Sequence, residues 1–296
     1  MSDHPPALAS VNGKVVPLLE ARIPALDRGF LFGDAVYEVL RVCGGRMWLA
    51  DEHFARLARS LAAVRISGVD LDRLRKRLEQ VIAAGPFLEA TAYIQITRGS
   101  APRAHKFPIA AEPLEFFYVD HFTDPYADAR RTGIRVVTAP DLRWDRCDIK
   151  STNLLANVLA MQAASEAGCT EAILYLPDGT LTEGTHTSFF GVREEAVLTA
   201  PNSAAILPGI TRGLIIGLAA RAGIAMREHV VRREDLPWLS ELFLTGTTSE
   251  VMPIIHVDGR AMGKGQPGPV TRRLQQAYRE AVDEFRRQGQ KTRASL

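Results

Sequence analysis

The sequence has few of the features that mark a membrane protein, a secreted protein or a nucleic-acid-binding protein. No apolar run approaches the roughly 20 residues that span a bilayer. The first ten residues, MSDHPPALAS, lack the basic start and the apolar stretch of a signal peptide. The net charge over 296 residues is only +2, and no block of like charge stands out. We therefore expect a cytoplasmic protein whose partners include neither a membrane nor a nucleic acid.

Cysteine is scarce as well, with only Cys43, Cys147 and Cys169 in the chain. An odd number of cysteines without metal-ligand spacing favours a reduced compartment and predicts no metal site. Cys147 lies close to Lys150, but no base is evident nearby to activate its thiol. We therefore do not expect Cys147 to act as a nucleophile.

Lysine is rare too, since only six of the 36 basic residues are lysines. Only lysine can form an imine, because its amine can lose a proton where a guanidinium cannot. Lys150 stands just before a helix predicted from about residue 152 to 167. An amine beside an apolar helix is partly desolvated, which lowers its pKa and makes it nucleophilic. Taken alone, the segment fits an ordinary lysine at a helix start better. The apolar stripe expected to face inward consists of Leu154, Leu155, Val158 and Met161.

The pattern of apolar residues predicts an α+β chain in two unequal halves. We place the boundary in a polar segment that ends in glycine. This gives a smaller N-terminal α/β domain over residues 1–122, a linker over 123–133 and a larger C-terminal domain over 134–296. In the first domain, Asp51 and Asp70 are each expected to cap a helix. Strands are expected over 36–42, 92–97, 114–120, 134–138, 241–245 and 254–258, among others.

Three further features could serve a phosphorylated pyridine cofactor. Glu183 follows a predicted turn, and a carboxylate there could pair with a ring nitrogen, although a lone glutamate beside a turn is usually solvated. Gly209 precedes a helix that opens near Thr211, so free amides and the helix dipole favour an anion there. The loop Gly246-Thr247-Thr248-Ser249 is rich in hydroxyl groups, which also suit a phosphate. Each signal is weak alone, but together with Lys150 they describe what pyridoxal 5'-phosphate (PLP) needs.

Six segments in a fixed order make the chain recognisable: DRGFLFGDAVYEV, YIQITRGSAPRAHKFP, RWDRCDIKSTNLLANVLA, EAILYLPDGTLTEGTHTSFFG, LPGITR and TTSE. The chain resembles the class IV, or fold-type IV, aminotransferases. This group includes branched-chain aminotransferases, D-amino acid aminotransferases and aminodeoxychorismate lyase. The match runs from about Asp27 to about Ile254, and it looks most like the bacterial D-amino acid aminotransferases. The resemblance implies the two-domain fold-type IV fold and PLP as cofactor.

The resemblance also implies a role for each matching residue around the cofactor. Lys150 would form the Schiff base with PLP and move the proton between substrate and cofactor. Glu183 would pair with the pyridine nitrogen, and Arg56 would contact the phosphate. The other cofactor contacts implied are the ring packing of Leu207, the amides of Ile210 and Thr211, the hydroxyl of Thr247, and Thr248. Two departures concern the phosphate site: Gly246 stands where near relatives carry serine, and His186 lies in a run that is mostly serine in them.

For the substrate, the resemblance implies that Tyr37 lines the pocket. Arg103 and His105 would hold the α-carboxylate and would reach the site from the partner subunit, so a homodimer is expected. This pair favours transamination of D-amino acids such as D-alanine or D-glutamate with 2-oxo acids such as 2-oxoglutarate or pyruvate. The runner-up is a branched-chain L-amino acid aminotransferase, and (R)-amine transamination is a further possibility. An aminodeoxychorismate lyase and a PLP-binding protein without turnover fit less well.

Overall fold

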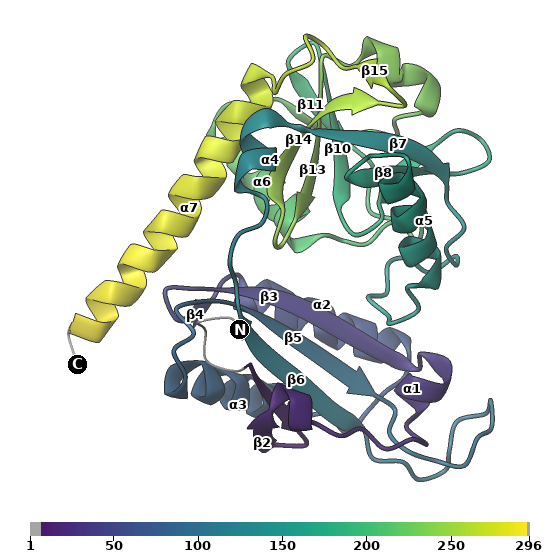
Figure 1. Ribbon diagram of the computed structural model, residues 1–296, viewed down its shortest axis with the longest axis vertical. Helices are drawn as coiled ribbons and strands as arrows, with labels where there is room; N and C mark the ends of the chain where they lie inside the picture. The colour runs from purple at the N-terminus through teal and green to yellow at the C-terminus, as the bar shows by residue number, and fades with distance from the viewer. Residues whose placement is uncertain (1–6, 295–296) are drawn as a thin grey trace. The chain divides into compact units, whose positions relative to one another are not determined.

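The computed structural model describes residues 7–294, and side chains as far as residue 290. The chain forms two compact units (Figure 1). Unit 1 holds the described residues up to Thr123, the short segment Ile149–Asn153 and the end of the last helix from Glu284. Unit 2 holds Asp124–Asp148 and Leu154–Asp283. Two segments therefore depart from the predicted domains, because residues 149–153 and the end of the last helix belong to unit 1.

The described strands of unit 1 form a six-stranded antiparallel sheet in the order β2-β1-β6-β5-β3-β4. The strands are β1 (Leu8–Val11), β2 (Lys14–Pro17), β3 (Ala35–Cys43), β4 (Arg46–Met47), β5 (Glu89–Thr97) and β6 (Leu114–His121). The helices are α1 (Arg28–Phe32), α2 (Ala50–Ala63), α3 (Leu71–Ala84) and the short 3-10 helix η1 (Leu18–Glu20).

Side chains alternate between the two faces of the unit 1 sheet, and one of these faces packs against α2 and α3. Val36 and Leu40 of β3 lie in one core with Leu57 of α2 and Leu78 of α3. Successive side chains of a strand point to opposite faces, so Tyr37 points away from this core. Alternate side chains of β3 can thus serve a site while their neighbours hold the helices.

One of the two predicted helix caps is confirmed. Asp70 accepts a hydrogen bond from the Arg73 amide at 2.9 Å and caps α3. The prediction for Asp51 is wrong. Helix α2 begins at Ala50, after Leu49 in a left-handed conformation with φ 54°, so Asp51 lies inside the first turn.

The described strands of unit 2 form a nine-stranded mixed sheet in the order β12-β11-β10-β13-β14-β7-β8-β9, with β15 beside β14. The strands are β7 (Ile134–Pro140), β8 (Glu171–Tyr175), β9 (Leu181–Gly184), β10 (Ser188–Arg193), β11 (Ala196–Thr199), β12 (Met226–Glu228), β13 (Glu241–Gly246), β14 (Glu250–Val257) and β15 (Arg260–Ala261). The helices are α4 (Ala127–Thr132), α5 (Leu155–Glu166), α6 (Ile210–Arg221), α7 (Pro269–Ala294) and the 3-10 helix η2 (Arg233–Trp238). The predicted linker thus contains α4.

Helix α5 differs from its prediction in its start and in its buried face. It begins at Leu155 with no side-chain cap from the described residues, rather than near residue 152. Leu155 and Val158 were expected to point inward, yet they are 71% and 59% exposed in the single chain. Ala164 is buried instead, in a small core with Ala172 of β8. Because α5 is apolar on nearly every side, periodicity could not identify the face that packs on the sheet.

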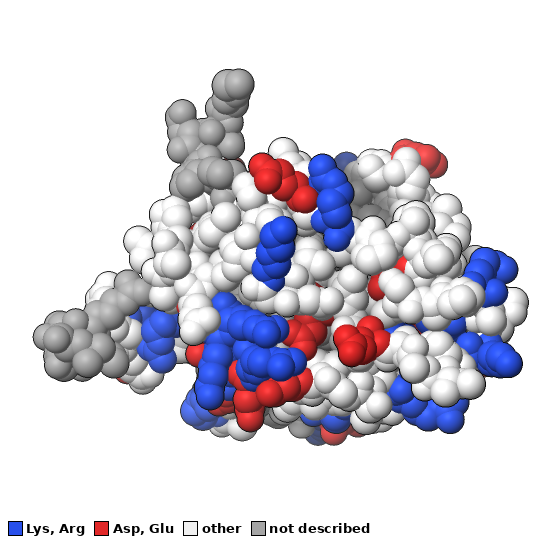
Figure 2. Space-filling model, turned by 90° about the horizontal axis from the view of Figure 1, so that it is seen from below, with Lys and Arg blue, Asp and Glu red and all other residues white. Residues whose placement is uncertain are grey.

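The surface carries charges of both signs. In Figure 2, basic and acidic side chains lie interspersed among uncharged ones on the face that is shown. None of the helices in residues 7–294 is both long enough and apolar enough to span a lipid bilayer.

Candidate active site

Lys150 is held in unit 1 by the start of β3. The Tyr37 amide donates to the Lys150 carbonyl at 2.9 Å, and Val36 forms a bridge with Ser151. On its other side, the Lys150 amide donates to Ser60 Oγ of α2 at 3.3 Å. The Lys150 Nζ lies 4.3 Å from the centre of the Tyr37 ring. The structure therefore brings together two predicted site residues and ties the lysine backbone to β3 and α2.

A stack of tyrosine rings extends from Tyr37 across the sheet. Tyr37 stacks on Tyr93 of β5 at 5.6 Å, and Tyr93 stacks on Tyr118 of β6 at 5.3 Å between ring centres. Burial raises the pKa of Tyr93, so this phenol stays neutral and donates to Gln95 at 2.7 Å. The sequence drew attention to Tyr37 but not to the two tyrosines stacked beside it. Their signal is the aromatic residues at alternate positions of β6, opposite Tyr93.

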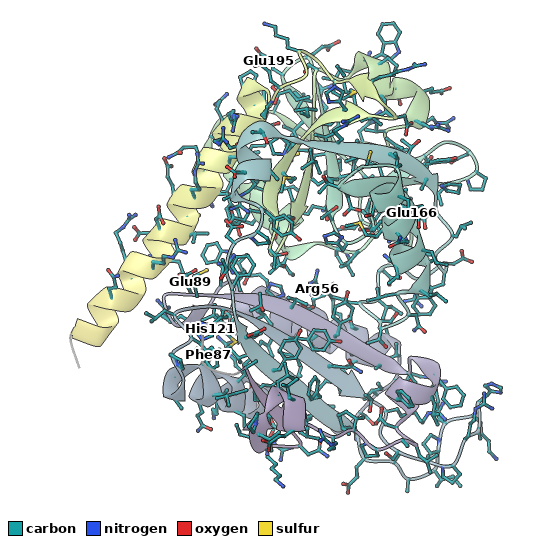
Figure 3. All side chains as sticks on the ribbon, viewed as in Figure 1. Arg56, Phe87, Glu89, His121, Glu166 and Glu195 are labelled. Atoms are coloured by element: carbon teal, nitrogen blue, oxygen red, sulfur yellow. The ribbon has the colours of Figure 1, made fainter. Side chains whose placement is uncertain are left out.

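Arg56 comes from α2 (Figure 3) and forms a buried cluster with Glu38 and His53. Its Nε and Nη2 donate to the two Glu38 oxygens at 2.7 and 2.8 Å, and His53 Nδ1 lies 2.7 Å from Glu38. Burial raises the pKa of Glu38, but the Arg56 charge outweighs burial and holds this pKa at about 2. Burial lowers the pKa of His53, so its ring is neutral. Glu38 and His53 were missed because both lie in stretches that look like ordinary core.

Arg103 and His105 lie on the loop between β5 and β6, and both are exposed. The Arg103 guanidinium lies 5.2 Å from the centre of the Phe32 ring, and the His105 ring lies 5.6 Å from it. The two predicted carboxylate ligands therefore lie against the same aromatic ring. Among the described residues, no hydrogen bond or ring contact joins them to Tyr37 or Lys150 within the chain.

In unit 2, Glu183 is a buried residue of β9. It is 5% exposed, so the interpretation as a solvated turn residue is wrong. Arg143 Nη1 donates to Glu183 in a close ion pair, and the Leu207 amide lies 3.2 Å from both Glu183 oxygens. Arg143 also donates from Nε and Nη2 to Asp141 at 2.9 and 2.7 Å. The Leu207 backbone thus lies beside Glu183, and the sequence had not indicated the contacts with Arg143 and Asp141.

The charges of this cluster fit a cationic ring nitrogen. Burial alone would lower the pKa of Arg143, but Asp141 and Glu183 outweigh it and raise that pKa, so the guanidinium stays charged. Two carboxylates around one guanidinium leave a net charge of about −1, which a protonated pyridine can balance. Burial raises the pKa of the nearby Cys147 thiol to about 11, which argues against a nucleophilic thiolate.

The predicted phosphate groups meet at one end of the unit 2 sheet. Helix α6 begins at Ile210, and no side chain in the described residues caps it at Gly209. A Cβ on Gly209 would lie 2.5 Å from Ser188 Oγ, so the start of the helix sits against the start of β10. Ser188 pairs with Thr245 of β13, directly before the turn that holds Thr247 and Thr248.

This end of the sheet also has buried hydroxyl groups without a partner. Ser249 Oγ and Thr245 Oγ1 are buried and make no hydrogen bond within the part of the chain that the structure describes. A Cβ on Gly246 would lie 2.7 Å from Ser249 Oγ and 3.4 Å from Thr187 Cγ2. Glycine therefore leaves room beside Ser249, a member of the hydroxyl-rich loop that the sequence indicated. His186, the second departure, points to the buried Glu171 with Nδ1 at 3.0 Å.

Known proteins resemble this chain in sequence and in structure. The family model for amino-transferase class IV matches residues 35–257. The chain belongs to the class IV aminotransferases. The D-alanine aminotransferase of Bacillus licheniformis is 37% identical over 275 residues, which cover 92% of this chain and 95% of that protein.

Two solved structures share the fold of this class IV aminotransferase. The branched-chain amino acid aminotransferase from Escherichia coli is 27% identical with a TM-score of 0.83, and 92% of each chain is covered. The T.th. branched-chain amino acid aminotransferase with pyridoxamine 5'-phosphate is 25% identical with a TM-score of 0.86, and 95% of each chain is covered. The family and the α+β fold-type IV architecture predicted from the sequence are thereby confirmed.

The cofactor of this class IV aminotransferase is PLP. The residues of unit 2 fit that group. Glu183 offers a buried carboxylate for a ring nitrogen. The start of α6 and the Ser249 hydroxyl, which have no side-chain cap and no hydrogen-bond partner within the described residues, suit a phosphate. In unit 1, Lys150 offers an amine above the Tyr37 ring.

Proposed function

We propose that this aminotransferase moves the amino group of D-amino acids, of the D-alanine or D-glutamate type, to 2-oxo acids such as 2-oxoglutarate or pyruvate. The observation that carries the proposal is the pair Arg103 and His105 on one loop, together with near full-length similarity to a D-alanine aminotransferase. The branched-chain alternative is supported by solved structures, but these are only 25–28% identical. Since one fold serves many substrates, the closer sequence relative carries more weight.

The chain's own residues divide the work on the cofactor. When bound, PLP supplies an electron sink that makes the α-hydrogen of an attached amino acid acidic. Lys150 Nζ takes that hydrogen as a proton, and the contacts of its backbone with Tyr37 and Ser60 keep the amine in place. Glu183 accepts a hydrogen bond from the protonated ring nitrogen, and its ion pair with Arg143, which Asp141 also holds, keeps this carboxylate in place.

The phosphate is held, in this proposal, mainly by backbone and hydroxyl groups. The amides of Ile210 and Thr211 point from the start of α6, where the helix dipole favours an anion. Thr247, Thr248 and Ser249 add donors from the turn between β13 and β14. Leu207 packs on the ring, and Arg56 contributes positive charge while Glu38 holds its side chain.

Substrate handedness follows from where the α-carboxylate is held. The reacting hydrogen must point at Lys150, so the side that binds the carboxylate decides which enantiomer reacts. A guanidinium supported by an imidazole is a directional carboxylate clamp, and Tyr37 lines the same pocket. Arg103 and His105 therefore favour D-amino acids.

The test is a comparison of kcat/KM for D- and L-alanine, D- and L-glutamate and L-leucine. We expect the D-forms to react faster, and Arg103→Ala to raise KM for amino acids while an amine without a carboxylate is less affected. A preference for L-leucine would establish the branched-chain alternative instead.

We further propose a homodimer in which Arg103 and His105 serve the partner's site. The exposed apolar face of α5 supports this, because Leu155, Val158 and Leu159 are 71%, 59% and 62% exposed in the single chain. A face of this kind on a helix fits a second copy of the chain. A cytoplasmic location is also proposed, since Cys43, Cys147 and Cys169 form no disulfide in the described structure.

A further inference from the structure

We propose that Arg28 is a positioning residue that fixes the loop carrying Arg103 and His105, and that it thereby sets the affinity for the substrate carboxylate. The inference rests on the proposed role of Arg103 and His105 as carboxylate ligands. Arg28, together with Asp34, which holds the Arg28 side chain, would then influence substrate binding without contacting the substrate.

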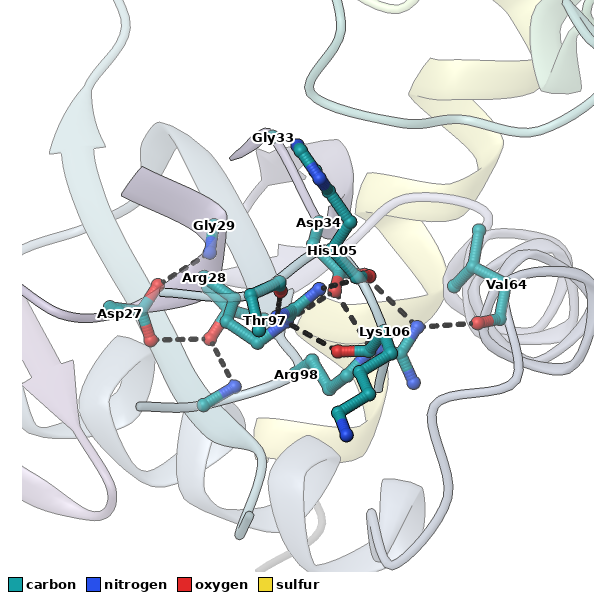
Figure 4. A network of polar contacts seen from close by, with 12 residues as sticks. Asp27, Arg28, Gly29, Gly33, Asp34, Val64, Thr97, Arg98, His105 and Lys106 are labelled. Atoms are coloured by element: carbon teal, nitrogen blue, oxygen red, sulfur yellow. Dashed lines mark hydrogen bonds and ion pairs between the residues drawn. The ribbon is translucent and has the colours of Figure 1, made fainter. Parts of the chain in front are cut away.

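Arg28 donates to the backbone of the loop at consecutive residues (Figure 4). Its Nη1 lies 2.6 Å from the Ala104 carbonyl and 3.5 Å from the Lys106 carbonyl, and its Nη2 lies 3.4 Å from the His105 carbonyl. Arg28 is 3% exposed and belongs to α1, so its own position is firm. One buried guanidinium therefore holds the backbone of His105 itself and of both its neighbours.

Asp34 connects this guanidinium to a second one. Its Oδ2 accepts from Arg28 Nε at 2.8 Å and from Arg98 Nε at 2.8 Å, and Oδ1 accepts from Arg98 Nη2 at 3.0 Å. Arg98 also donates to the carbonyls of Val64 and Arg65 at 2.7 and 2.8 Å, just beyond the end of α2. The loop is thus tied through two arginines and one carboxylate to rigid elements of unit 1.

Phe107 adds an anchor on the other side of His105. The Arg98 guanidinium lies 3.6 Å from the centre of its ring and the Arg65 guanidinium lies 4.7 Å from it. The neighbouring side chains are mostly exposed, Ile109 completely so. A loop with so little buried surface of its own stays ordered only through such anchors.

The hydrogen bonds of Arg28 show why it positions the loop rather than binding substrate. Its Nε is taken by Asp34 and its two terminal nitrogens by loop carbonyls. A lysine could not replace this fork, because one ammonium cannot span several carbonyls and a carboxylate at once. A loop ordered before binding loses less entropy when the carboxylate arrives, so loss of Arg28 should weaken binding more than chemistry.

The experiment compares Arg28→Met with Arg22→Met in the holoenzyme. Arg22 is a matched control, because it also donates to backbone carbonyls, those of Leu19 and Ala21, but away from this loop. Two properties are measured: the hydrogen–deuterium exchange of residues 100–108, and the steady-state kinetics with D-alanine, which give KM and kcat. We expect Arg28→Met to speed exchange in the loop and to raise KM roughly tenfold with kcat changed about twofold at most. Arg22→Met should change neither property.

Arg103→Ala separates this inference from the proposed function. If Arg103→Ala leaves KM unchanged, the carboxylate clamp is wrong and the proposed function fails with it. If Arg103→Ala raises KM but Arg28→Met does not, or if exchange in the loop stays at the wild-type rate, the role of Arg28 is wrong. Should Arg28→Met fail to fold, Asp34→Asn tests the same link, and a normal KM with normal loop exchange in that variant overturns the proposal.

Discussion

Glu183 and Glu38 are both nearly inaccessible to water, and each is held by a buried arginine. Their clusters nevertheless differ in charge. Asp141 adds a second carboxylate beside Glu183, which leaves that cluster negative and ready for a cationic ring. Glu38 meets one arginine and a neutral histidine, so its cluster is close to neutral. The Glu183 cluster is therefore suited to contact a charged ligand, whereas the Glu38 cluster is suited to hold the Arg56 side chain in place.

The first residue-scale prediction concerns the ring nitrogen. Glu183→Gln should still bind PLP but should transaminate roughly 100-fold more slowly, about 2.7 kcal/mol in barrier, because a neutral amide cannot stabilise the pyridinium. The measurement is kcat at saturating PLP, with Glu194→Gln on the surface as control. Unchanged turnover in Glu183→Gln would mean that another group serves the ring.

The second residue-scale prediction concerns acid stability. The pKa of Glu38 is lowered from 4.5 to about 2, with burial opposing the shift and Arg56 causing it. A depressed pKa gives stability that is present above 4.5 and lost as the pH falls toward 2. At neutral pH, the free energy of unfolding of Glu38→Gln should be about 3–5 kcal/mol lower than that of wild type, because the substitution leaves the Arg56 charge unpaired.

Urea unfolding at a series of pH values tests this. The difference in the free energy of unfolding between wild type and Glu38→Gln should become smaller as the pH falls from 4.5 to 2. A difference that stays constant over this range would show that protonation of Glu38 is not coupled to unfolding. Glu52→Gln, on the exposed side of α2, serves as the control.

At the scale of elements, the turn between β13 and β14 carries the next prediction. Ser249 Oγ is buried without a partner in the described chain, beside Gly246. Ser249→Ala should weaken PLP binding by about 1 kcal/mol, roughly fivefold in Kd, through loss of one hydrogen bond. Ser165→Ala, on the exposed side of α5, should leave the Kd unchanged. An unchanged Kd in Ser249→Ala would remove this hydroxyl from the phosphate site.

Elements with a strong local signal could be predicted from the sequence. Asp70 before α3 and the alternating strand β3 agree with expectation, since each depends on a few neighbouring residues. Helix α5 differs from its prediction, because an apolar helix has no unique inward face and Leu155 could not be assigned to surface or core. Asp51 failed as a cap because Leu49 takes a left-handed conformation that no sequence pattern indicated.

For the candidate site as well, the sequence predicts only what depends on neighbouring residues. The motif segments predicted roles for Lys150 and Glu183, because those roles depend on residue type and spacing. Arg143 and Glu38 could not be predicted, because their partners come from other elements and the ion pairs exist only after folding. Arg28 was missed for the same reason, since it lies 76 residues before the carbonyl of Ala104 that it holds.

At the scale of the whole molecule, sequence and structure comparisons point to different substrates. The curated relatives at 34–37% identity are D-alanine aminotransferases, whereas solved structures with TM-scores of 0.83–0.86 include branched-chain enzymes. Backbone similarity reports the shared fold, and the loop with Arg103 and His105 is a small part of it. The fold therefore cannot decide between the substrates, but the side chains of this loop can.

Assembly gives the whole-molecule prediction. Lys150→Ala chains should be inactive alone, and Arg103→Ala chains should have little activity at D-alanine concentrations far below their raised KM, yet hybrids of the two should contain one site with both wild-type residues. After complete subunit exchange, about a quarter of the sites should be active, since half the dimers are hybrids with one good site each. No recovery of activity after confirmed exchange would show that each site is built from one chain.

The most direct test of the whole account is the variant Lys150→Ala. We expect wild-type protein to be yellow, with a visible absorption band that moves when an amino donor is added. Lys150→Ala should fold normally by circular dichroism but should lose the visible band, and its turnover should fall at least about 1,000-fold. Lys76→Ala, on the exposed side of α3, should keep both the band and the turnover. Full activity in Lys150→Ala would contradict the account.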